Sequence, residues 1–171
     1  YSEAIESESA PETTRATALN NRALLRFAAG DRTRARTDLT QALRLDRSIE
    51  DRQGEALRLR NLAAVDLEDG ALDSAIRGLG RAHAMDVRRQ DPAAIARDLE
   101  ALAVARWMQG EDRRLALSER RRSYNIDVLQ RTVPQAERQR EAIILWCLEL
   151  AADPVPVDCL FESATPDSGG D

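Results

Sequence analysis

Residues 61–86, NLAAVDLEDGALDSAIRGLGRAHAMD, read as a complete helix, a tight turn and a second helix. On both sides of Gly70, apolar residues recur at spacings of three and four, which is the pattern of an amphipathic helix. A glycine directly after a helix permits the left-handed backbone that ends it. The stretch therefore predicts a helical hairpin.

The hairpin is echoed on both sides at one fixed spacing. Gly30 and Gly110 stand 40 residues before and after Gly70, and the flanking apolar positions shift with them. Self-similarity at a period of this length is typical of stacked repeat architectures. We predict three helix-turn-helix repeats, at about residues 12–47, 51–90 and 92–130.

A seventh helix is predicted at residues 134–152, with Pro134 in its first turn, where proline is tolerated. Stacked repeats need an atypical last element to cover the open apolar face, and this helix fits that role. We therefore expect an all-α solenoid of three repeats with a C-terminal capping helix. An acidic lead-in, residues 1–11, precedes this domain of residues 12–152, and an irregular acidic tail, residues 153–171, follows it.

Composition agrees with an all-helical chain, because aromatics are only 4% of the 171 residues and Ala and Leu dominate the apolar fraction. Every basic residue is Arg, which we interpret as genomic GC bias in a bacterial source. The net charge of −5 is uneven. Residues 1–14 carry four acids and residues 153–171 carry five, without a base in either, so the body between them is mildly basic. Such patches can pair, although acidic tails more often serve solubility.

Cys147 and Cys159 are the only cysteines, one on the predicted seventh helix and one in the tail. They can form a disulfide in an oxidising compartment or remain free thiols in the cytosol. Because the sequence starts at Tyr1 rather than Met, we expect a processed or excised piece whose signal peptide, if any, is gone. No apolar run approaches the ~20 residues of a membrane-spanning helix. We favour the periplasm or cell envelope of a bacterium, with the cytoplasm as the alternative.

The positions of bulky and small residues resemble those of the tetratricopeptide repeat (TPR) family. That family has a Leu-small pair on the first helix, Gly at the turn, Ala five residues later, and Ala-Leu-x-Leu-Asp at the end of the second helix. In the middle repeat the matching residues are Leu59, Leu62, Ala63, Gly70, Ala75 and Ala82 to Asp86. In the first repeat they are Leu19, Ala23, Gly30, Ala35 and Ala42 to Asp46.

The third repeat departs from this pattern. It keeps Leu102-Ala103 and Gly110 but has Leu115 in the frame of the Ala, with Glu119 and Arg122 where the others have Leu and Ala. We expect its second helix to be frayed or rebuilt towards its end. The period also exceeds the ~34 residues usual in the family, so the chain resembles the long-repeat members.

The resemblance implies that the first helices line a concave groove that holds a peptide or helix of another protein. The residues that it places in this groove are Asn20, Asn21, Leu24, Phe27, Arg60, Asn61, Ala64, Arg97, Val104 and Trp107, with Leu67, Glu100 and Met108 beside them. Asn side chains can grip a peptide backbone, and Arg60 and Arg97 can hold a carboxylate. The alternative is that Asn21 and Asn61 bond neighbouring helices of the protein itself.

Catalysis finds little support in the sequence. The only histidine, His83, falls on the second helix of repeat two, where we expect a packing residue. Without a ligand cluster or a glycine-rich loop, we predict no enzyme, no metal and no cofactor. Acids interrupt the basic run at 113–122 and no aromatics accompany it, so nucleic acid is not an expected partner.

We therefore predict a non-enzymatic scaffold or adaptor in a bacterial cell-envelope assembly. The alternative is a regulatory or sensor module of a larger intracellular transcription regulator or signalling protein.

Overall fold

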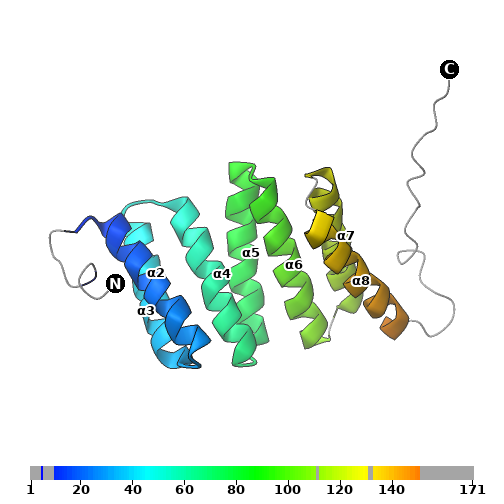
Figure 1. Ribbon diagram of the computed structural model, residues 1–171, viewed down its shortest axis with the longest axis horizontal. Helices are drawn as coiled ribbons and strands as arrows, with labels where there is room; N and C mark the ends of the chain where they lie inside the picture. Colours follow the sequence, from blue (N-terminus) through cyan, green and yellow to red (C-terminus); the bar gives the residue numbers. More distant parts are fainter. Residues whose placement is uncertain (1–4, 6–9, 111, 131–132, 151–171) are drawn as a thin grey trace, which may run out of the picture.

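The computed structural model describes residues 5, 10–110, 112–130 and 133–150. Seven helices account for nearly all of this part, and no strand occurs in it. Labelled as in Figure 1, they are α2 (Glu12–Ala28), α3 (Arg32–Ser48), α4 (Arg52–Glu68), α5 (Leu72–Arg89), α6 (Pro92–Gln109), α7 (Arg113–Leu129) and α8 (Val133–Leu150). The predicted all-α repeat architecture is confirmed.

Glycine and aspartate set the helix boundaries. Gly30, Gly70 and Gly110 end the first helix of each repeat with φ angles of +82°, +73° and +79°, in the left-handed region that glycine adopts at little cost. At the start of α3, the side chain of Asp31 accepts a hydrogen bond from the backbone N–H of Arg34. Equivalent caps begin α4, α6 and α7. Each repeat therefore becomes a hairpin by local chemistry.

The helices form two layers, as Figure 1 shows where α2 crosses in front of α3 and α8 in front of α7. Each helix packs mainly on the helices before and after it in the chain, as expected for a solenoid. The core is accordingly divided into small clusters between adjacent helices. One of them joins Ala63 of α4, Leu79 of α5 and Leu102 of α6. We call α2, α4, α6 and α8 the first helices and α3, α5 and α7 the second helices.

The third repeat has one extra residue between its turn glycine and its second helix, because α7 begins three residues after Gly110, whereas α3 and α5 begin two residues after Gly30 and Gly70. α7 begins 41 residues after α5, whereas α5 begins 40 residues after α3. The buried alanine that corresponds to Ala75 is therefore Ala116, and Leu115 is partly exposed. The sequence alignment that placed Leu115 at this position was wrong by one residue.

This shift also explains how the second helix of the third repeat is built. Arg120 occupies the position of Leu79, and Ser123 that of Ala82. Both are buried, and Ser123 Oγ donates a hydrogen bond of 2.8 Å to the carbonyl oxygen of Ala96. α7 is as long as α3, so this helix is rebuilt with polar contacts and is not frayed.

α8 packs against α7 and covers the end of the stack, where Ile143 is fully buried against Leu117. None of the described helices is both long and apolar enough to cross a membrane.

Candidate functional site

The outward side of the first-helix layer, which we call the first-helix face, carries a row of apolar side chains. Leu24, Ala64, Val104 and Leu145 occupy equivalent positions on α2, α4, α6 and α8. Leu24 is 44% exposed and Leu145 is 65% exposed. Ala64 is also exposed and Val104 is partly buried, so the row crosses the whole stack with its most exposed large side chains on α2 and α8.

A second row lies one helical turn further along each first helix. Phe27, Leu67 and Trp107 hold equivalent positions there and are partly buried. Met108 beside them is exposed, as is Leu57 near the start of α4. The predicted apolar groove residues thus belong to two adjacent rows on one face.

The aromatic end of this face is a stack of four side chains. Trp107 and Trp146 lie parallel, with their ring centroids 4.3 Å apart. The guanidinium of Arg113 lies over the ring of Trp107, and that of Arg120 lies over the ring of Trp146, each at 5.0 Å from the ring centroid. Cation–π contacts of this kind favour arginine. Both rings are partly buried in this stack.

The asparagines link two first helices. Asn61 Nδ2 of α4 donates a hydrogen bond of 2.7 Å to Asn20 Oδ1 of α2. Asn20 Nδ2 in turn lies 3.4 Å from Asn21 Oδ1, and the Asn20 side chain is buried. Asn20 therefore connects the two residues that the sequence singled out, whereas Asn21 and Asn61 stay partly exposed.

Arg60 has acidic partners inside the protein. Its Nη1 donates to Asp98 Oδ1 of α6 at 3.0 Å and to Asp86 Oδ2 of α5. Both carboxylates are fully buried. Burial, helped by the nearby Asp86 and opposed by Arg60, raises the pKa of Asp98 to about 6. Arg97 in contrast is exposed, so it is the predicted arginine that is open to a partner carboxylate.

The sequence reading missed a buried polar seam between repeats. The acid that ends each second helix meets a residue 12 positions later on the next first helix. Asp46 Oδ2 lies 3.1 Å from Arg58 Nε, and Asp127 accepts a hydrogen bond from Gln139. In the middle pair the residue at this position is Asp98, facing Asp86, and Arg60 supplies the positive charge. The regular spacing of Asp46, Asp86 and Asp127 in the sequence could have indicated this seam.

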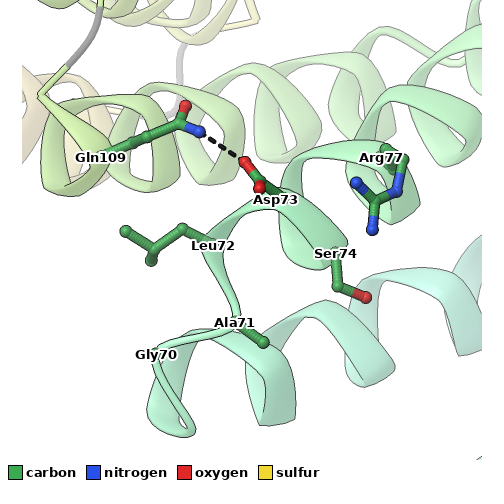
Figure 2. A pocket seen from close by; sticks show the side chains of 7 residues that line it. All are labelled: Gly70, Ala71, Leu72, Asp73, Ser74, Arg77 and Gln109. Carbon is green, nitrogen blue, oxygen red and sulfur yellow. Dashed lines mark hydrogen bonds between the residues drawn. The ribbon is translucent and has the colours of Figure 1, made fainter.

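A shallow depression of about 450 Å³ lies beside the α4–α5 turn and is lined by Gly70, Ala71, Leu72, Asp73, Ser74, Arg77 and Gln109. Figure 2 shows these residues. Across the depression, Gln109 Nε2 donates a hydrogen bond of 2.6 Å to Asp73 Oδ1. None of the predicted groove residues lines it. Among the described residues, no group of three or more His, Cys, Asp or Glu side chains could hold a metal ion.

The possible disulfide concerns residues beyond those that the structure describes. Cys159 and the side chain of Cys147 lie outside the described part of the chain, so their pairing stays a prediction.

No protein-family model and no curated protein matches the chain. Among solved structures, the N-terminal domain of stress-induced protein-1 (STI-1) from C. elegans is similar in fold, with a TM-score of 0.58 and 20% sequence identity. The similarity covers 78% of this chain and 98% of that chain. The protein therefore has a TPR-like helical repeat fold.

Proposed function

We propose that the protein is a non-enzymatic adaptor whose first-helix face binds a peptide or helix of a partner protein. The observation that carries this proposal is the apolar row Leu24, Ala64, Val104 and Leu145, which crosses every first helix. Three of its members are exposed and Val104 is partly buried. Apolar side chains that gather on one face of a protein often mark an interaction site.

The repeat spacing suits an apolar ligand of either conformation. Packed helices lie roughly 10 Å apart. A partner helix presents residues i and i+7 about 10 Å apart on one side, and a peptide in the polyproline II conformation presents residues i and i+3 about 9 Å apart on one side. Burying a leucine completely contributes about 1.5–3 kcal/mol, so Leu24 and Leu145, each about half exposed, can contribute about 1 kcal/mol apiece. Arg97 at the margin adds a donor for a partner carboxylate.

The proposed setting is a bacterial cell-envelope assembly, supported by the two late cysteines. Intact mass measured before and after reduction tests it. A gain of two hydrogens supports the oxidised pair, whereas free thiols in freshly isolated protein favour the regulatory module of an intracellular protein.

Affinity purification from the native host tests the face itself. The variant Leu24→Glu/Leu145→Glu places two charges in the apolar row, and Val87→Glu/Val128→Glu places two on exposed apolar positions of the second helices as a matched control. We expect a specific partner to be captured by the wild type and the control but lost from the row variant, with helicity unchanged in all three. Equal capture by both variants would remove the first-helix face from the proposal.

A further inference from the structure

On the second helices, most acidic side chains are buried and most arginine side chains are exposed. α3, α5 and α7 contain six acidic residues, of which only Asp73 is exposed. The other five are Asp38, Asp46, Asp86, Glu119 and Asp127. The same helices expose nine arginines, namely Arg32, Arg34, Arg44, Arg47, Arg77, Arg81, Arg88, Arg114 and Arg122. We call this side the second-helix face.

The buried acids face inward because they bind arginines of the first helices. Asp38 pairs with Arg22 and Arg26 of α2 at 2.8 and 2.6 Å. Glu119 pairs with Arg106 of α6 at 3.2 Å. Because these acids are turned toward the first helices, the second helices expose nine arginines and only one acid of their own.

The first helices show no such separation. Their exposed arginines and exposed acids are equal in number among the described residues, namely Arg52, Arg97, Arg138 and Arg140 against Glu12, Glu68, Glu137 and Glu141. Positive charge is therefore a property of one face and not of the whole solenoid.

The exposed arginines of α5 and α7 occupy related positions on these two helices. Arg81 and Arg122 are equivalent in the repeat, and Arg77 lies one turn before Arg81. Some of the exposed arginines have acidic partners, such as Arg81 with Glu55 at 3.4 Å. Within the described part of the chain, Arg44, Arg77, Arg88, Arg114 and Arg122 have neither an ion pair nor a hydrogen bond.

We propose that the acidic segment 153–171 of the same chain binds the second-helix face. This segment carries five acids and no base, which complements a face with nine exposed arginines and one exposed acid. Attraction between opposite charges on exposed surfaces acts over a Debye length of about 8 Å at physiological ionic strength. The contact is therefore reversible and sensitive to salt, and it leaves the first-helix face open.

The geometry allows this contact within one molecule. α8 ends at Leu150 on the edge of the fold that also holds the α6–α7 turn, where Arg113 and Arg114 begin α7 (Figure 1). Extended residues 151–171 span up to roughly 70 Å, whereas a 17-residue helix such as α7 is about 25 Å long. The tether also gives the segment an effective concentration on the order of millimolar, which a free anionic polymer must overcome.

Nucleic acid fits the face less well. Non-specific binding to single strands combines positive charge with aromatic side chains on which bases stack. Tyr124 is the only aromatic residue of α3, α5 and α7, and it is partly buried. The charge is present without stacking platforms, which favours an acidic polypeptide.

Paramagnetic relaxation in the full-length chain tests the proposal directly. A nitroxide attached to Cys159 in a Cys147→Ala variant broadens the amide signals of residues that the segment approaches. We expect strong broadening at low salt on the outside of α5 and α7, and none at Ala64 or Val104 on the first-helix face. In 1 M NaCl, where the Debye length is about 3 Å, most of the broadening should disappear.

Two sets of arginine substitutions make the result specific. Arg77→Gln/Arg114→Gln/Arg122→Gln should abolish the broadening, whereas the matched set Arg52→Gln/Arg97→Gln/Arg138→Gln on the first helices should preserve it. Circular dichroism of every variant checks that the helices are intact. Broadening that is absent in the parent, or that both sets affect equally, overturns the proposal.

Mixing and ligand controls identify other occupants. In the mixing experiment, one sample carries the nitroxide but no isotope label, and the other carries the isotope label but no nitroxide. If the first broadens the signals of the second, the segment binds a second copy and the intramolecular proposal is wrong. If the segment causes no broadening, but a single-stranded oligonucleotide or an anionic vesicle shifts the same amides, that ligand occupies the face instead. These experiments need no partner protein, so their outcome is independent of the proposed adaptor function.

Discussion

Trp107 of α6 and Trp146 of α8 stack with their ring planes 6° from parallel. These two rings connect first helices that are otherwise joined mainly through α7. Arg113 and Arg120 each contribute a guanidinium to the stack. The capping helix is therefore held to the third repeat by aromatic contacts as well as by the apolar contact of Ile143 with Leu117.

We expect the two tryptophans to act as one unit in folding. Trp146→Ala and Trp107→Ala should each lower the free energy of unfolding by about 2–3 kcal/mol, somewhat less than for a fully buried aromatic because both rings are partly exposed. The double variant should lower the free energy of unfolding by about 0.5–1.5 kcal/mol less than the sum of the two single variants, because the stacking contact is removed only once. Urea unfolding of the wild type, the two single variants and the double variant, followed by circular dichroism, measures this double-mutant cycle. Strict additivity of the free-energy changes would show that the rings are not coupled.

Arg120 occupies a position where the other two repeats bury Leu39 and Leu79. Burial lowers the pKa of Arg120, against the opposing effect of Glu100. Replacing a buried ion by a well-packed apolar residue is often neutral or stabilising. We expect Arg120→Leu to leave the free energy of unfolding unchanged or to raise it by about 1 kcal/mol.

The control for this position is Arg120→Ala, which leaves a cavity and removes the cation–π contact with Trp146. It should destabilise the protein in the same urea titration by about 1–3 kcal/mol. Loss of folding in Arg120→Leu would show instead that the charge itself is required.

The regular parts of the fold could be predicted from the sequence because their causes are local. Gly30, Gly70 and Gly110 each end a helix through their own backbone conformation, and the apolar spacing around them is visible in the chain. The extra residue in the third turn follows Gly110, so the glycine spacing that defined the repeat carried no sign of it. The register of α7 was consequently displaced by one position.

The candidate site was predictable only in part, for a related reason. The apolar groove positions repeat along the sequence, so Leu24, Ala64 and Val104 could be aligned without a structure. The partners of Arg60 could not, because Asp86 and Asp98 lie 26 and 38 residues away and meet only when three helices pack. An arginine on a helix surface looks the same in sequence whether it faces a ligand or the next repeat.

The buried pair of Asp86 and Asp98 should give the fold a distinctive pH dependence. The pKa of Asp98 is raised to about 6 from an ordinary value of 3.8, so the folded state binds this proton more tightly than the unfolded state. The stability that Asp98 contributes is therefore complete below pH 3.8 and is lost as the pH rises through about 6. Because the two carboxyls interact, the observed midpoint belongs to the pair.

Asp98→Asn removes this titration and keeps an acceptor for Arg60. We expect the variant to gain stability relative to the wild type mainly as the pH rises from about 4 to about 6, between the ordinary and the raised pKa of Asp98, and to gain little more above pH 7. Urea unfolding at each pH measures the difference, from which acids common to both proteins, such as Asp69 with its lowered pKa, cancel. Parallel pH profiles would contradict a raised pKa at Asp98.

Gly54 and Gly80 offer a matched test of the seam between the first two repeats. Both lie inside helices, where Ala is favoured over Gly by about 0.5–1 kcal/mol. A Cβ at Gly80 meets nothing within 4 Å, but a Cβ at Gly54 would lie 2.6 Å from Asp51 Oδ2 and 2.7 Å from the Asp46 carboxylate. Asp51 caps α4, and Asp46 pairs with Arg58, so neither can move without losing a contact.

We therefore expect Gly80→Ala to raise the free energy of unfolding by about 0.5–1 kcal/mol and Gly54→Ala to lower it by about 1–3 kcal/mol. Thermal and urea unfolding of the two variants measure the opposite signs directly. If Gly54→Ala stabilises the protein as much as Gly80→Ala does, then Asp46 and Asp51 have room to move and the α3–α4 junction is not closely packed. The double variant Gly54→Ala/Asp46→Ala locates the clash. Removing the Asp46 carboxylate relieves the contact with the new Cβ but leaves Arg58 without its acidic partner. If the double variant is more stable than Gly54→Ala alone, the contact with Asp46 causes the destabilisation.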